Sequence, residues 1–128
     1  MHPLLQTLTD AAAGLYFLSE TDAPFVPVQL APGEGAEDGV RRLAGKAGAD
    51  PVEIQEAGHF LRNHTRALEG GPEAEARAAR FRALIALLQQ SLPGLKAYRT
   101  GSVQVDAFLL GTLPDGTLGG LRTQMVET

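Results

Sequence analysis

The sequence contains no cysteine, no tryptophan and no long uninterrupted hydrophobic run. Without cysteine the chain cannot form a disulfide framework, a thiolate zinc site or a cysteine nucleophile. No apolar stretch approaches the length that spans a bilayer, and residues 1–6 carry no basic segment of the kind that begins a secretion signal. We therefore expect a soluble, cytoplasmic protein that does not associate with membranes.

An excess of positive charge is also lacking. The chain has 15 acidic and 11 basic residues, which gives a formal net charge of −4. Direct binding of nucleic acid favours a basic surface, so this balance argues against it. A protein partner with a basic, phosphate-binding surface suits the chain better.

The length and composition indicate one globular domain over residues 1–128. The chain is 44% hydrophobic and 20% charged, which is typical of a folded domain rather than a disordered one. A domain of this length buries enough surface to fold without a metal or a disulfide. We expect no cofactor and a monomer when the protein is free.

Helical periodicity is clearest over residues 72–92. Pro72 suits a first-turn position, and apolar residues from Ala74 to Leu92 recur at alternating spacings of four and three. A second helix is predicted over 3–13, with Pro3 in its first turn.

The other expected elements follow from alternation and turn residues. Pro27 restricts its strand to a sheet edge or a bulge. Residues 52–70 are ambiguous, with Val52 and Ile54 able to start a short strand and 59–66 able to form a helical turn or two. The other predicted elements are a loop over 16–23, a strand over 25–30, a short helix over 37–46, and an antiparallel meander of strands over 95–99, 103–112 and 117–126.

Two histidines and a nearby glutamate suggest a metal site. Glu56 and His59 form an E-x-x-H pattern, and His64 follows. Helical dimetal sites need that pattern twice, however, and two histidines five residues apart point to different faces of a helix. Ordinary surface or packing histidines are the favoured interpretation.

Other catalytic patterns are weaker. The glycine-rich segment 33–39 lacks the spacing of a phosphate-binding loop and carries three acidic residues, so it is interpreted as a flexible loop. Ser19, Ser91 and Ser102 have no nucleophile-elbow sequence around them. Asp106 interrupts an apolar strand, and a solvated charge at a sheet edge is favoured over a functional role.

Two segments are unusual. Residues 17–25 form a polar stretch between aromatic anchors, with Pro24 stiffening its exit. At the C-terminus, the alternating pattern runs almost to Thr128, so the sheet would hold a hydroxyl and a free carboxylate at one fixed place. The simpler interpretations are a helix-to-strand connection and a strand that ends the chain.

These segments resemble the nuclease A inhibitor family. The first similarity is to L-x-F-x-S-E-[ST]-[DE]-x-P-F, at residues 15–25, and the second is to a Tyr-Arg-x-Gly turn, at residues 98–101. The third is an alternating strand at residues 103–111, and the fourth is a terminus similar to A-G-[IL]-x-T-x-V-V-E-T, at residues 119–128. The four occur in the family's order, and the helix around 81–92 matches as well.

The resemblance implies an α+β fold, an α/β/α sandwich with a four-stranded, mainly antiparallel sheet. It also implies inhibition of a sugar-non-specific, metal-dependent endonuclease. By position, Glu20 and Thr128 would reach the magnesium of the nuclease, directly or through water, and the metal would belong to the partner. Thr21, Asp22 and Glu127 adjoin them and complete the expected partner-binding set.

The chain also departs from the family pattern, with Ala23 where an aromatic residue is common, with Met125, and with Arg122 and Gln124 beside the terminus. Residues 31–75 match poorly, which motivates an alternative: a non-catalytic interaction domain of the same fold with a non-nuclease partner. An enzyme is the third possibility, for which Asp106, His59 and His64 are the only candidates.

Overall fold

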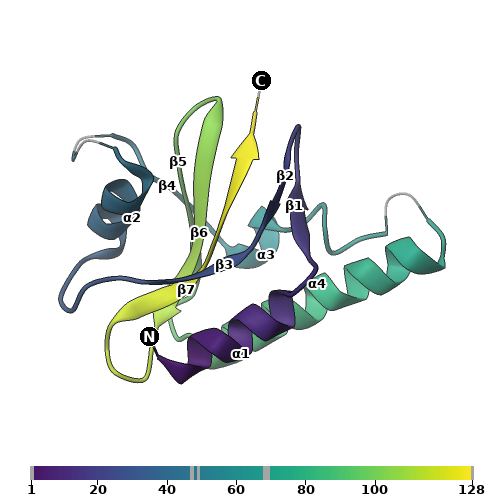
Figure 1. Ribbon diagram of the computed structural model, residues 1–128, viewed down its shortest axis with the longest axis horizontal. Coiled ribbons are helices and arrows are strands. Elements are labelled where there is room, and N and C mark those ends of the chain that lie inside the picture. Colours follow the sequence, from purple (N-terminus) through teal and green to yellow (C-terminus); the bar gives the residue numbers. More distant parts are fainter. Residues whose placement is uncertain (1, 47, 49, 68–69, 128) are drawn as a thin grey trace.

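The computed structural model describes residues 2–46, 48, 50–67 and 70–127. A five-stranded antiparallel sheet in the order β3-β7-β6-β5-β4 forms the centre of the protein, and a separate two-stranded hairpin lies beside it (Figure 1). The strands are β1 (Tyr16–Leu18), β2 (Asp22–Pro24), β3 (Val26–Gln29), β4 (Glu53–Gln55), β5 (Lys96–Thr100), β6 (Gln104–Thr112) and β7 (Leu118–Val126).

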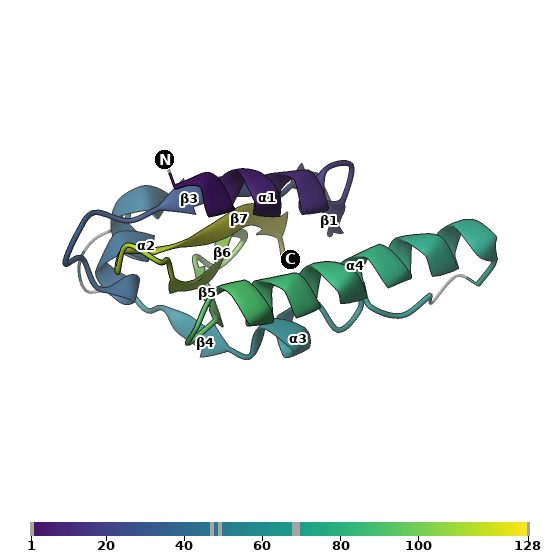
Figure 2. The same ribbon diagram turned by 90° about the horizontal axis from the view of Figure 1, so that it is seen from below.

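Helices cover both faces of the sheet. Helices α1 and α4 pack on one face and α2 on the other (Figures 1 and 2). The arrangement is an α+β fold, as predicted, and its core is divided into two hydrophobic clusters. The helices are α1 (Pro3–Ala12), α2 (Ala36–Ala44), α3 (Ala57–Phe60) and α4 (Pro72–Ser91).

The central strand β6 shows why two cores form. Successive side chains of a strand point to opposite faces. Val105, Ala107 and Leu109 therefore enter the larger cluster with α1 and α4, whereas Phe108 and Leu110 enter the smaller cluster with α2. Both clusters are closed to solvent around β6, which fixes the register of the sheet.

The sheet has five strands, not the expected four. The additional strand is β4, which pairs antiparallel with β5 at the edge of the sheet. Its three residues are too few to show a period, so residues 52–70 were left ambiguous, with Val52 and Ile54 able to start a short strand. The expectation for β3 was correct, since Pro27 lies in an edge strand where its missing N–H interrupts no ladder.

The prediction of a loop over 16–23 was wrong. This segment forms the β1–β2 hairpin, in which Phe17 is buried while Tyr16 and Leu18 are exposed. The polar residues 19–21 form the turn between the two strands, and Asp22 begins β2. No helix of the described residues has the length and apolarity needed to cross a membrane.

Candidate functional site

The turn of the β1–β2 hairpin is held by a serine. The Ser19 backbone N–H donates to the Thr21 carbonyl at 3.0 Å, and the Ser19 hydroxyl donates to the same oxygen at 2.9 Å. The Thr21 N–H donates back to Ser19 Oγ at 3.3 Å. These bonds close a tight turn around Glu20, so the backbone that carries this carboxylate has little freedom.

The same serine joins the hairpin to the end of β7. The Val126 N–H donates to Ser19 Oγ at 3.0 Å. Further down, the Thr123 hydroxyl donates to the Ala23 carbonyl at 3.3 Å. The hairpin and the end of β7 therefore lie together at one end of the molecule (Figure 1).

Glu20, Thr21 and Asp22 are exposed at the hairpin turn and its exit. Glu127 follows β7, and its backbone N–H donates to the Val103 carbonyl at 2.8 Å. Its carboxylate forms an ion pair with Arg99 of β5. Four of the five predicted partner-binding residues are thus gathered at one end of the molecule, and the fifth, Thr128, lies outside the described residues.

Aromatic stacking fixes the base of the hairpin. The Phe17 ring stacks on Phe60 with centroids 4.9 Å apart and contacts His64 at 4.5 Å. The His64 ring also contacts Phe81 of α4 at 5.0 Å. The hairpin is therefore attached to both α3 and α4 through ring contacts, which hold it in one orientation on the core.

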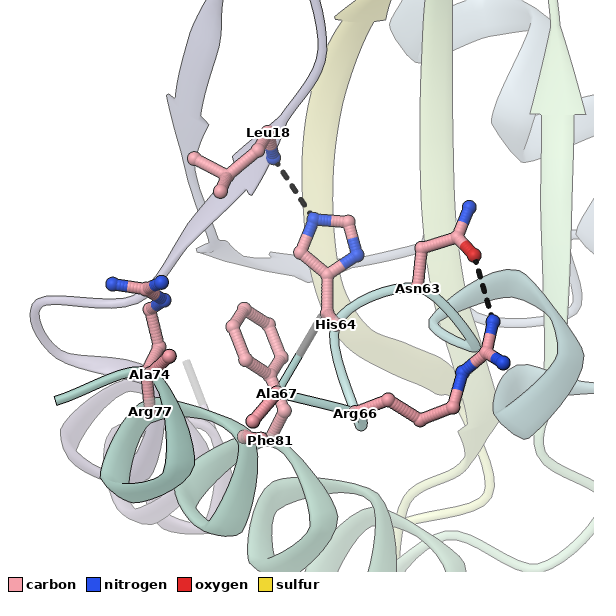
Figure 3. Close-up of a pocket in the computed structure, with 9 residues that line it drawn as sticks. Leu18, Asn63, His64, Arg66, Ala67, Ala74, Arg77 and Phe81 are labelled. Carbon is pink, nitrogen blue, oxygen red and sulfur yellow. Dashed lines mark hydrogen bonds between the residues drawn. The ribbon is translucent and has the colours of Figure 1, made fainter. Parts of the chain in front are cut away.

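His64 also binds the hairpin backbone. Its Nε2 accepts a hydrogen bond from the Leu18 N–H at 3.0 Å (Figure 3). This bond requires the neutral imidazole with its proton on Nδ1, a buried atom that has no hydrogen-bond partner among the described residues. Burial, and to a lesser degree the nearby Arg77 guanidinium, lower the pKa of His64 below its usual value.

The three side chains that suggested a metal site make other contacts or face solvent. His64 faces the hairpin and the aromatic rings, His59 is exposed on α3, and Glu56 forms an ion pair with Lys96. The parts of the chain that the structure describes contain no group of three or more metal-ligating side chains.

Asp106 does not lie at a sheet edge, contrary to the sequence interpretation. It lies on β6, the middle strand, and its side chain is only 15% exposed. Arg122 and Gln124 of β7 donate to its Oδ1 at 3.3 and 3.1 Å. It faces away from the cluster that contains Phe17 and Phe81, so the sheet separates Asp106 from His64. The two cannot form one catalytic site.

The glycine-rich segment 33–39 has a structural role. Glu34 accepts the Ala31 N–H at 3.1 Å and two hydrogen bonds from Arg42 of α2 at 2.7 Å each. These contacts, with Arg42 the larger contributor, lower the pKa of Glu34 to about 2. Residues 33–35 precede α2 and residues 36–39 form its first turn, so the segment is not the expected flexible loop.

Sequence reasoning missed two residues that build the site. Ser19 was considered only as a nucleophile, and His64 only as a ligand or packing residue. The bond from Ser19 to Val126 spans 107 positions and the bond from His64 to Leu18 spans 46, so no local pattern could reveal either one.

The described residues form a small domain that presents oxygen-bearing side chains on the β1–β2 turn and the end of β7. This arrangement is suited to binding another protein. The nuclease A inhibitor-like protein family model matches residues 2–128. The chain belongs to this family. No curated protein matches it.

Proposed function

We propose that this protein inhibits a sugar-non-specific, metal-dependent endonuclease by inserting Glu20 and Thr128 into the active site of the nuclease. Family membership supports the nuclease as partner. The single observation that supports the insertion is the bond from the Val126 N–H to Ser19 Oγ, which holds the Glu20 turn against the end of β7. A hairpin turn and a strand end joined in this way are able to enter one cavity together.

The oxygen atoms of Glu20 and Thr128 are suitable ligands for a nuclease metal ion. A hard cation such as Mg²⁺ takes oxygen ligands and keeps water-filled positions for phosphate oxygens. Glu20 would supply a carboxylate, and Thr128 a hydroxyl and a terminal carboxylate, either as direct ligands or through water. The ion belongs to the nuclease, so this mechanism requires no metal site in the inhibitor.

The adjacent predicted residues have supporting roles. Thr21 and Asp22 are exposed beside Glu20 and would contact the rim of the cleft. Glu127 would act differently, because its carboxylate pairs with Arg99 and so holds the end of the chain in place. The negative charge of the tip would steer the inhibitor toward a basic, nucleic-acid-binding cleft.

Rigidity is central to the affinity. Ordering a mobile segment on binding would cost affinity, whereas a preformed tip avoids that cost. Here the turn bonds of Ser19 and the ring contacts of Phe17 already fix the hairpin in the free protein.

Titration of a ββα-metal endonuclease with this protein, followed by DNA cleavage, tests the proposal. The wild-type protein should inhibit the nuclease, and Glu20→Ala should weaken inhibition by about 2–5 kcal/mol, the usual cost of removing one side of a buried charged contact. A C-terminal tag should also impair inhibition while the fold persists. The absence of inhibition by the wild-type protein would contradict the proposal and favour a non-nuclease partner.

A further inference from the structure

Glu20 and Thr128 cannot form a whole protein–protein interface by themselves. A stable protein–protein interface buries about 1,600 Å² in total, with apolar anchors around its polar contacts. Glu20 and Thr128 alone do not supply that area, and the sequence does not show which other residues would contribute.

Exposed apolar side chains are few in the described part of the chain. Among the described residues, five large hydrophobic side chains are exposed: Tyr16, Leu18, Val26, Ile54 and Val103. Val103, at 53%, is the most exposed of them, and Leu18 is 44% exposed. Isolated exposed apolar residues are common, so the position of these two matters more than their exposure.

Leu18 and Val103 lie on the two sides of the end of β7. On one side, Ser19, which follows Leu18, accepts the Val126 N–H at 3.0 Å. On the other side, the Val103 carbonyl accepts the Glu127 N–H at 2.8 Å. The hydrogen bonds thus place the hairpin, the end of β7 and the β5–β6 turn in a row, as Figure 1 shows at the upper edge of the sheet.

We infer that Leu18 and Val103 are apolar contacts for the nuclease on either side of its metal cleft. The inference rests on the proposed function and extends it to a defined docking surface. A cavity that receives both Glu20 and the end of the chain brings its rim against the residues beside them. The hairpin and the β5–β6 turn would then exclude water from the central polar contacts, as the surroundings of an interface hot spot do.

The occupant is the nuclease rather than a second copy of this chain. The same end of the molecule carries the exposed carboxylates of Glu20 and Asp22. Two copies placed end to end would bring these like charges together, whereas a basic, nucleic-acid-binding cleft would pair with them. Apolar surface of the nuclease on each side of such a cleft would contact Leu18 and Val103.

The test uses serine substitutions with a matched control. Leu18→Ser and Val103→Ser should each raise the inhibition constant about tenfold, because full burial of one such side chain is worth roughly that factor or more. Ile54→Ser is the control: Ile54 is 48% exposed but lies in the middle of β4, opposite Tyr98 of β5 and beside α2 rather than at the β5–β6 turn. It should inhibit like the wild-type protein. The Leu18 substitution keeps its backbone bond to His64, and equal thermal midpoints would show that all three variants fold.

The possible outcomes are distinct. Weaker inhibition by Leu18→Ser and Val103→Ser but not by Ile54→Ser supports the docking surface. Full inhibition by both variants, with loss in Glu20→Ala, overturns the docking surface and leaves the proposed function intact. No inhibition by the wild-type protein overturns both. Dimerisation of the wild-type protein in sedimentation experiments, abolished by Val103→Ser while inhibition is unchanged, would assign these side chains to self-association and overturn the inference.

Discussion

The Ser19 hydroxyl oxygen accepts a hydrogen bond from the Val126 backbone at 3.0 Å, across 107 positions of sequence. The same oxygen receives the Thr21 N–H within the hairpin turn. One side chain therefore sets both the shape of the Glu20 turn and its distance from the end of β7. This double role places Ser19 among the residues on which inhibition should depend, although it need not touch the nuclease.

Ser19→Ala should weaken inhibition more than it weakens the fold. The loss of a hydrogen bond of this kind costs about 0.5–1.5 kcal/mol of stability. The inhibition constant should rise further, because the freed turn must be ordered again on binding. Urea denaturation and nuclease titration of the same samples measure the two effects. A variant with wild-type inhibition would show that Ser19 does not position the tip.

The His64 contact predicts a pH dependence. The neutral imidazole accepts the Leu18 N–H, and the pKa of His64 is lowered, so the unfolded chain binds the proton more readily than the folded one. Stability contributed by this group is present above the unfolded pKa of about 6.5. It decreases as pH falls below that value, until the lowered pKa of the folded state is passed.

His64→Gln should remove this part of the pH dependence, because an amide oxygen can accept the same hydrogen bond without titrating. The matched control is His59→Gln, at an exposed position on α3. Denaturation curves between pH 5 and pH 7.5 compare the three proteins. The assignment is wrong if His64→Gln loses stability toward acid as steeply as the wild-type protein does.

Gly101 is required for the β5–β6 turn. Its φ is +110°, and a Cβ atom there would lie 2.2 Å from the Gln104 carbonyl oxygen. Gly101→Ala should therefore destabilise the protein by more than about 1 kcal/mol, because an alanine costs more than this where the native backbone cannot accept its Cβ atom. Gly116→Ala is the control, because Gly116 also has a positive φ, +87°, but no atom lies within 4 Å of its added Cβ. Equal thermal midpoints for the two variants would contradict the crowding argument.

Glu127 distinguishes a supporting role from direct contact with the metal. Its side chain is 45% exposed and pairs with Arg99. A partly exposed ion pair is worth about 1 kcal/mol or less, so Glu127→Gln should raise the inhibition constant only a few-fold. A loss as large as that of Glu20→Gln would place the Glu127 carboxylate in the nuclease cleft instead.

The sequence predicted the elements with long, regular patterns. The apolar stripe of α4 and the alternation along β6 indicated their type correctly, and Pro27 indicated an edge strand. The three-residue strands β1, β2 and β4 are too short to show a period, and their pairing depends on contacts with distant segments.

The sequence indicated candidate site residues but not the contacts that hold them in place. Family motifs pointed to Glu20, but the bonds that hold its turn come from Ser19 and His64, through partners that only the fold brings near. Glu127 stays a predicted partner-binding residue, and its pairing with Arg99 depends on the register of β5, β6 and β7, which no local pattern shows.

The central claim is that Glu20 enters the metal shell of the nuclease, and water-proton relaxation on a Mn²⁺-loaded nuclease tests it most directly. Saturating wild-type inhibitor should lower the relaxation enhancement, because an oxygen donor from the inhibitor replaces or immobilises water on the metal. Glu20→Ala, added at concentrations that still saturate the nuclease, should restore most of the enhancement. An unchanged enhancement on full inhibition by the wild-type protein would contradict the account.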